Sequence, residues 1–170
     1  MWGEGWTFSQ NIRLYGIADG GMVLRDERGS IRIYAKNAIQ DGTQTYFKPP
    51  HYNYTLTKDT STGTYTLALD GGGDTLRFDS EGKLTRRENL SGQYLTYTYD
   101  ASDRLASITD VDSHSITLRY DGPGTPGRLS QITDVATGRT STFSYTSGNL
   151  TTIRDDAGTT EQATTTLGYG

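Results

Sequence analysis

The chain has 170 residues, 32% of them hydrophobic, and a formal net charge of -4. Its Lys and Arg are scattered singly, without the basic stripe that contacts with a phosphate backbone require, which argues against nucleic acid as a partner. The absence of Cys excludes disulfides and thiolate metal sites, and the apolar runs are too short to span a bilayer.

The first half of the chain predicts irregular hairpins. The opening, MWGEGWTFSQ, lacks the basic start and apolar core of a secretory signal. Residues 22–34 and 64–82 each place a polar turn, at 26–29 and 70–73, between short apolar runs, which is typical of a β-hairpin. Between them, Pro49 and Pro50 in KPPHYNY cannot donate to a ladder, so this segment is predicted to be an edge or a crossing loop.

The second half repeats. Two sets of residues recur with a period in the twenties, leucines that open each repeat and tyrosines that close it: Leu84, Leu105, Leu129 and Leu150; Tyr99, Tyr120, Tyr145 and Tyr169. Such a period indicates a solenoid or an array. Turn formers fill DVDSHS, DVATGR and DDAGTT between openings and endings. Each repeat is therefore predicted to be a β-hairpin.

Each repeat ends in strict alternation, which predicts a strand with one buried face. The residues expected on that face are Leu95, Tyr97 and Tyr99; Ile116, Leu118 and Tyr120; Phe143 and Tyr145; and Leu167 and Tyr169. At the repeat opening, Leu105 and Ile108 are three residues apart, so strict alternation would place them on opposite faces. A bulge or bend near the opening would bring them to one face.

These elements predict an all-β fold of tandem hairpins in one long, curling antiparallel strip, with roughly sixteen strands. No apolar stripe of period 3.6 runs for three turns, so no helix is expected. We expect a single domain over residues 1–170, with irregular hairpins in 1–81 and about four repeats in 82–170. A strip buries one face at most, so it must curl on itself, take further repeats or pair with another chain.

The sequence resembles the RHS/YD-repeat family over nearly its whole length. The match consists of Arg104, Leu105, Ile108, Thr109, Asp110, Tyr120 and Asp121, followed by Arg128, Leu129, Ile132, Thr133, Asp134 and Tyr145. The opening GEGWTFSQNIRLY resembles the segment that starts the family's repeat region, through Gly3, Gly5, Trp6, Ser9 and Leu14.

The sequence also departs from the family pattern. Arg87 and Glu88 follow Leu84 where Ile and Asp are expected, and Asn149 replaces the usual Arg. Tyr145 and Tyr169 lack the Asp that follows the family's tyrosine. The repeat positions assigned on this pattern are Leu84, Tyr99, Arg104, Leu105, Ile108, Asp110, Tyr120, Arg128, Leu129, Ile132, Asp134, Tyr145, Leu150, Ile153 and Tyr169.

The resemblance implies a β-sheet strip that spirals into a hollow shell. In bacterial members such a shell encloses a C-terminal toxin, and related repeats occur in insecticidal toxin complexes and animal cell-surface proteins. It implies a secreted or cell-surface location, as part of a larger exported protein. The acidic self-cleavage region of bacterial members has no counterpart here, so shell wall without cargo or protease is expected.

The residues capable of chemistry favour structural roles. The two imidazoles, His51 and His114, are expected in loops, without a nucleophile motif beside them. The recurrent carboxylates are Asp100, Asp110, Asp121, Asp134 and Asp155; their equivalent positions indicate turns rather than an acid/base pair. The stretch DGGGD, residues 70–74, lacks the Lys of a P-loop and the ligand series of an EF-hand, so a turn is favoured. No catalytic residue, cofactor or metal is predicted.

Two further readings stay open. The aromatic residues Trp2, Trp6, Tyr46, Tyr52 and Tyr54 are expected mainly in the core, with glycan stacking as a less favoured alternative. Asn53, Asn89 and Asn149 begin glycosylation patterns that would matter only in a eukaryotic secretory pathway.

Three functional hypotheses follow. The favoured one is a structural module that supplies wall to a shell around a toxin or other polypeptide, supported by further repeats of a parent chain. The second is an adhesion or self-assembling unit that joins through unpaired sheet edges. The third is a glycan-binding module. If the register is right, Tyr120→Ala should destabilise by roughly 3 kcal/mol, as aromatic truncations in cores do.

Overall fold

The computed structural model describes residues 12–121, 127–156 and 162–169, and this part of the chain is all β. Fifteen antiparallel strands form one sheet in chain order, without a helix among the described residues. The all-β prediction is confirmed. The strands are β1 (Arg13–Gly16), β2 (Met22–Arg25), β3 (Ile31–Gln40), β4 (Thr43–Phe47), β5 (Tyr54–Asp59), β6 (Tyr65–Leu69), β7 (Thr75–Phe78), β8 (Leu84–Glu88), β9 (Tyr94–Tyr99), β10 (Leu105–Asp110), β11 (Ser115–Tyr120), β12 (Leu129–Asp134), β13 (Thr140–Thr146), β14 (Asn149–Asp156) and β15 (Gln162–Thr166).

The described chain divides into two compact units, whose boundary falls within β9: the N-terminal unit, residues 12–96, and the C-terminal unit, residues 97–169. The sequence places its change from irregular hairpins to repeats earlier, at 81–82. The one-domain assignment over residues 1–170 remains a prediction.

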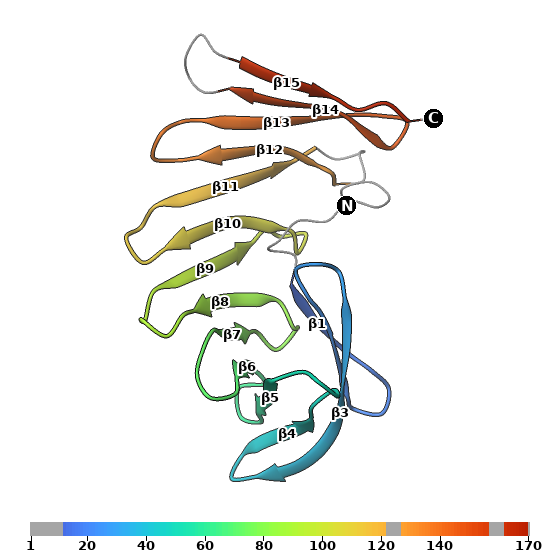
Figure 1. Cartoon of the computed structure of the whole chain (residues 1–170), viewed down its shortest axis with the longest axis vertical. Coiled ribbons are helices and arrows are strands. Elements are labelled where there is room, and N and C mark those ends of the chain that lie inside the picture. Colours follow the sequence, from blue (N-terminus) through green and yellow to red (C-terminus); the bar gives the residue numbers. More distant parts are fainter. Residues whose placement is uncertain (1–11, 122–126, 157–161, 170) are drawn as a thin grey trace. The chain divides into compact units, whose positions relative to one another are not determined.

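In the N-terminal unit, the first strand, β1, contacts the turn between β7 and β8. The N–H of Leu14 on β1 donates to the carbonyl of Gly82, at 2.9 Å, and Arg13 bridges to Lys83. Gly82 has a φ of +79° in the turn between β7 and β8. Figure 1 shows β1 and β3 beside β5–β8. This unit therefore has apolar residues on two facing sets of strands.

Cross-strand rows form the core of the N-terminal unit. Leu56, Leu67 and Leu76 pair across β5, β6 and β7, and all three are buried. A second row continues through Phe78 and Leu84, 1% and 0% exposed. The remaining buried apolar residues of this unit are Ile12, Leu14, Met22, Leu24, Tyr34, Tyr46 and Tyr65.

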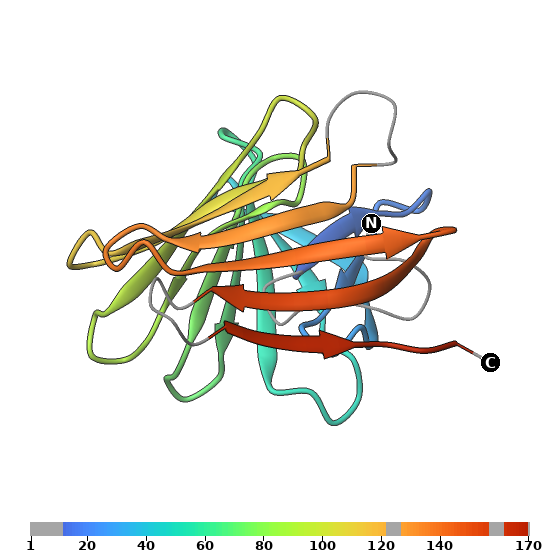
Figure 2. The ribbon, with the colours of Figure 1, turned by 90° about the horizontal axis from the view of Figure 1, so that it is seen from above.

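The C-terminal unit is a succession of hairpins. Strands β10–β15 follow one another with antiparallel neighbours, and Figure 2 shows β11–β15 lying side by side. One face carries Leu118 opposite Ile132, and Tyr120 opposite Leu129. The buried apolar residues described in this unit are Tyr97, Leu105, Ile108, Leu118, Leu129 and Leu150.

Bulges occur at the repeat openings, where the sequence suggests them. In three repeats the register shifts by one residue directly after the opening leucine, which leaves Thr85, Ser130 and Thr151 as the extra residues. Leu105 and Ile108, the pair that prompted the expectation, are both buried. A bulge lets residues three apart face the same side.

The prediction of a buried face is wrong at two residues: Ile116 is 36% exposed, and Tyr169 is 49% exposed. Ile116 shares a face with Leu118 but lies near the 110–114 turn, opposite Asp134, where this face is open to solvent. Tyr169 follows β15, beyond the last described strand. The loop predicted at KPPHYNY is present, since residues 48–53 connect β4 to β5.

Candidate functional site

The turns of the hairpins are built by a carboxylate or amide at their first residue. Its side-chain oxygen accepts N–H donors two and four residues later, and its carbonyl accepts the N–H three residues later, from a residue with positive φ. Five turns share this pattern: 26–30, 79–83, 89–93, 100–104 and 110–114. The recurrent Asp is therefore engaged in turn formation.

The tyrosine that ends a hairpin binds the residue that opens it. The hydroxyl groups of Tyr120, Tyr145 and Tyr169 donate to the carbonyls of Leu105, Leu129 and Leu150, at 2.9, 2.9 and 2.7 Å. Burial raises the pKa of Tyr120 to about 12 and also raises that of Tyr145. Both hydroxyls thus stay protonated and can donate.

An arginine covers the ring in two of these hairpins. The guanidinium carbon of Arg104 lies 4.6 Å from the ring centre of Tyr120, and that of Arg128 lies 4.8 Å from the ring centre of Tyr145. A guanidinium over an aromatic face is favourable. We call this pair of contacts the tyrosine clasp. In it, the tyrosine hydroxyl donates to the leucine carbonyl and an arginine lies over the tyrosine ring.

Arg104 also joins the clasp to its turn. Its Nε and Nη2 lie 2.8 and 2.7 Å from Oδ2 of Asp100. Burial alone would raise the pKa of Asp100, but hydrogen bonds from the backbone and side chain of Arg104 and from Ser102 outweigh it and lower the pKa. Asp100 is therefore held as a carboxylate by the residue that covers Tyr120.

The residue after the opening leucine has a role that the repeat pattern does not indicate. Thr85, Ser130 and Thr151 donate their hydroxyls to the carbonyls of Arg77, Arg119 and Ser144, at 3.1, 3.1 and 3.2 Å. These are the bulge residues, so the hydroxyl binds the opposite strand where the ladder is locally disrupted. The recurrent Leu-Ser or Leu-Thr pair is the signal, with Leu105-Ala106 as the exception.

The repeat positions assigned from the sequence fall into these roles. The four opening leucines and Ile108 are buried, whereas Ile132, Ile153, Tyr99, Tyr120 and Tyr145 are half-buried. Asp110 and Asp134 begin turns. The motif residues Gly3, Gly5, Trp6 and Ser9 lie outside the described residues, and Leu14 is buried in β1.

His114 is exposed and lies in a turn with two carboxylates. One ligand atom from each of Asp110, Asp112 and His114 falls within 4.8 Å of the others, so the three could hold a metal ion. Oδ1 of Asp110 is taken by the turn, and its Oδ2 lies 3.2 Å from Nδ1 of His114. Hydrogen bonds from His114 and Asp112 lower the pKa of Asp110 against the opposing effect of burial.

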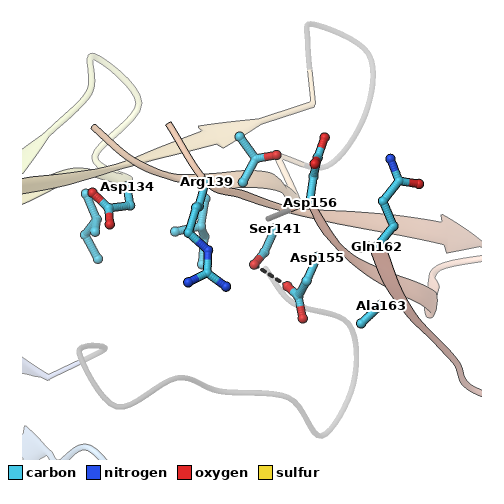
Figure 3. Close-up of a pocket in the computed structure, with 10 residues that line it drawn as sticks. Asp134, Arg139, Ser141, Asp155, Asp156, Gln162 and Ala163 are labelled. Atoms are coloured by element: carbon cyan, nitrogen blue, oxygen red, sulfur yellow. Dashed lines mark hydrogen bonds between the residues drawn. The ribbon is translucent and has the colours of Figure 1, made fainter. Parts of the chain in front are cut away.

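An open hollow of about 780 Å³ lies on the C-terminal unit and gathers several of its carboxylates. Figure 3 shows Asp134, Asp155 and Asp156 around it, with Arg139 and Ser141. Asp155 accepts the Ser141 hydroxyl, and Asp134 accepts the backbone N–H of Ala136 and the hydroxyl of Thr137. Asp134 and Asp155 thus serve the turn and the strand pairing.

The aromatic residues considered for glycan stacking divide in the structure. Tyr46 is buried, at 7% exposed, whereas Tyr52 and Tyr54 line a smaller hollow within the N-terminal unit. Trp2 and Trp6 lie outside the described residues. The stretch at residues 70–74 is a turn between β6 and β7, in which Asp70 binds Lys48 and Thr55.

Successive hairpins held by the same tyrosine clasp define a tandem β-hairpin repeat protein. A family model described as Teneurin YD-shell matches residues 54–160, from β5 through β14. The match covers more than half of the chain, and the chain belongs to the Teneurin YD-shell family, a shell repeat of the RHS/YD type. The resemblance inferred from the sequence is confirmed.

A comparison with curated proteins gives no match. None of the described segments forms an apolar helix of membrane-spanning length. Shells of this family are structural repeats of extracellular or cell-surface proteins.

Proposed function

We propose that this chain supplies wall to a β shell that encloses another polypeptide, in a larger exported protein. The observation that carries this is the tyrosine clasp, repeated from hairpin to hairpin in the C-terminal unit. It assigns the recurrent Tyr, Leu, Arg and Asp to holding strands together. Repeat proteins are stabilised mainly through such neighbour contacts, which permit extension by further copies of the unit.

The face that would line the shell is partly open to a polypeptide. Phe143 pairs with Ile153, and Leu118 pairs with Ile132 on the same side of the sheet. Leu118 is buried, but Phe143, Ile153 and Ile132 are only half-buried. A row of half-exposed apolar side chains is the surface that an enclosed chain would cover.

The test is limited proteolysis of the product of the complete native reading frame, followed by mass spectrometry of the resistant particle. We expect residues 54–160 to persist in a large particle together with a second, protected polypeptide segment. Phe143→Asp should expose that segment to cleavage, while Thr142→Asp, on the opposite face of β13, should leave it protected. Recovery of residues 54–160 as a small particle with nothing enclosed would overturn the proposal.

A second candidate is self-assembly through a sheet edge. In β15, residues Gln162–Thr166 are all exposed and none is charged, and no described strand pairs with its outer side. Exposed edges without charged residues are templates for pairing with another chain. Light scattering over a range of concentrations, with electron microscopy, should then show growing oligomers or filaments that Thr164→Lys abolishes; a monomer at every concentration would remove this candidate.

A further inference from the structure

A second hollow, of about 280 Å³, lies wholly within the N-terminal unit. On one side are β3 and the turn between β2 and β3, and on the other are the segment before β5 and strands β5–β8. Ile12, Leu24, Leu67 and Leu76, all buried, form the aliphatic part of its lining. Its size is just below the range of small-molecule pockets, which span roughly 300–1,000 Å³, so it suits a small ligand.

Two tyrosines form its aromatic wall. The ring centres of Tyr52 and Tyr54 are 5.1 Å apart, and the guanidinium carbon of Arg32 lies 5.3 Å from the ring centre of Tyr52. The hydroxyl of buried Tyr34 donates to the carbonyl of Tyr54, at 3.1 Å, and the ring of Tyr34 meets Tyr52 edge to face. These contacts fix both rings before any ligand arrives.

The polar wall is also held in place. Arg87 donates through Nε and Nη2 to Oδ2 of Asp74, at 2.9 and 2.6 Å, and through Nη1 to Glu27, at 3.3 Å. Oδ1 of Asp26 accepts the N–H groups of Arg28 and Ser30. The hollow therefore presents carboxylates and guanidinium groups whose positions are set by hydrogen bonds to their neighbours.

The charges around the hollow are nearly balanced. Its lining holds the carboxylates of Asp26 and Glu27 and the guanidinium groups of Arg28, Arg32 and Arg87. The third guanidinium group, that of Arg87, is paired with Asp74, which lies outside the lining. This balance disfavours an anionic or cationic ligand. It suits a neutral ligand with many hydroxyls, because each hydroxyl both donates to a carboxylate and accepts from a guanidinium group.

We propose that this hollow binds a neutral saccharide of one or two rings. The C–H face of a sugar ring stacks on an aromatic ring, and Tyr52 and Tyr54 supply that surface. Its hydroxyls meet the carboxylates and guanidinium groups of the opposite wall. This site is independent of the shell proposal, since all of its residues lie in the N-terminal unit and none belongs to a tyrosine clasp.

The test is a glycan array of defined neutral sugars probed with the whole chain, followed by saturation-transfer NMR with the methyl glycoside of each hit. Tyr52→Ala should weaken binding by about tenfold, the equivalent of one aromatic contact. Tyr15→Ala is the matched control, because Tyr15 is 44% exposed on β1 outside the hollow. It should leave binding unchanged.

A second variant guards against misfolding of Tyr52→Ala. Arg28 is exposed at the rim, and Arg28→Ala removes a guanidinium group without touching the core. It should weaken binding several-fold at an unchanged melting temperature. Absence of any neutral-sugar hit, a hit that both variants retain at full affinity, or binding of peptides alone would each overturn the proposal.

Discussion

The two units show how one repeat is stabilised in two settings. Of the described apolar residues, twelve buried ones lie in the N-terminal unit and six in the C-terminal unit. In the N-terminal unit β1 returns to the turn at Gly82, so that the sheet face is covered from within the unit. In the C-terminal unit the same face is half-buried, and the tyrosine clasp binds each hairpin's end to its beginning. Burial dominates in the first unit and local polar contacts contribute more in the second.

Phe78 and Tyr120 make this comparison residue by residue. Each pairs with an opening leucine, Leu84 or Leu129, and each is followed in the sequence by an Asp. Phe78 is 1% exposed and has no hydroxyl, whereas Tyr120 is half-buried and donates to Leu105. The aromatic side chain at this position is thus stabilised by burial in the N-terminal unit, and by the tyrosine clasp in addition to partial burial in the C-terminal unit.

The largest effect is expected from removing these rings. Phe78→Ala should destabilise the N-terminal unit by about 4 kcal/mol, and Tyr120→Ala the C-terminal unit by roughly 3 kcal/mol, because the deeper ring leaves the larger cavity. Urea denaturation gives the free energies of unfolding, and hydrogen exchange read by mass spectrometry assigns each loss to its unit. A Tyr120→Ala loss equal to or above that of Phe78→Ala would contradict the comparison.

The next effect tests the return of β1. A Cβ at Gly82 would lie 2.2 Å from the carbonyl oxygen of Leu14, and the φ of +79° disfavours any other residue. Gly82→Ala should therefore cost about 3 kcal/mol, from backbone strain and overpacking together. Gly92, at the same position of an equivalent turn, has φ +76° and nothing within 4 Å of its Cβ site, so Gly92→Ala should cost only about 1 kcal/mol. Equal losses in urea denaturation would mean that β1 does not constrain this turn.

A smaller effect isolates the hydroxyl of the clasp. Tyr120→Phe keeps the ring under Arg104 and removes the hydrogen bond to Leu105, so it should cost about 1 kcal/mol. Tyr15→Phe, at an exposed tyrosine of β1, should change the free energy of unfolding by less than about 0.5 kcal/mol. If the two substitutions have the same effect on the urea midpoint, the hydroxyl contributes nothing to the hairpin.

The hairpins could be predicted from the sequence because their signals are local. Alternation marks the strands, and the recurrence of Leu129 and Leu150 marks the openings. An Asp or Asn followed three residues later by Gly marks three of the five turns built on a side-chain acceptor: 26–30, 79–83 and 89–93. The bulge was inferred from the spacing of Leu105 and Ile108 alone, since a period-2 strand cannot bury both.

The rest depends on contacts between distant residues. The bridge from Arg13 to Lys83 joins residues that share no pattern, and nothing local identifies Leu14 as the residue that covers Gly82. The tyrosine hydroxyl and the leucine carbonyl that it binds lie 15, 16 and 19 positions apart in the three hairpins, so this contact has no fixed spacing. The hollow between Tyr52 and Leu76 likewise forms only after β3 packs beside β5–β8. Ile116 is exposed because it lies near a turn, and the alternation of apolar and polar residues does not indicate how close a strand residue lies to the end of its sheet face.

The smallest effect concerns the charge that joins clasp and turn. The pKa of Asp100 is lowered in the folded chain, so its stabilising contribution is present above the unfolded value near 4 and is lost as the pH falls through the folded value. Because the side chain of Asp100 is 27% exposed and solvent partly screens its pair with Arg104, we expect less than about 1 kcal/mol. Asp100→Asn keeps the turn acceptor but removes the charge, so the stability of this variant should fall less than that of the native chain between pH 7 and pH 3.

Asp59→Asn in the N-terminal unit is the matched control. The pKa of Asp59 is lowered by hydrogen bonds from Ser61 and Thr62, without an arginine. Added salt should therefore reduce the pH-dependent difference for Asp100→Asn more than for Asp59→Asn. Equal salt sensitivity of the two would show that Arg104 acts on Tyr120 alone and leaves Asp100 as a simple turn residue.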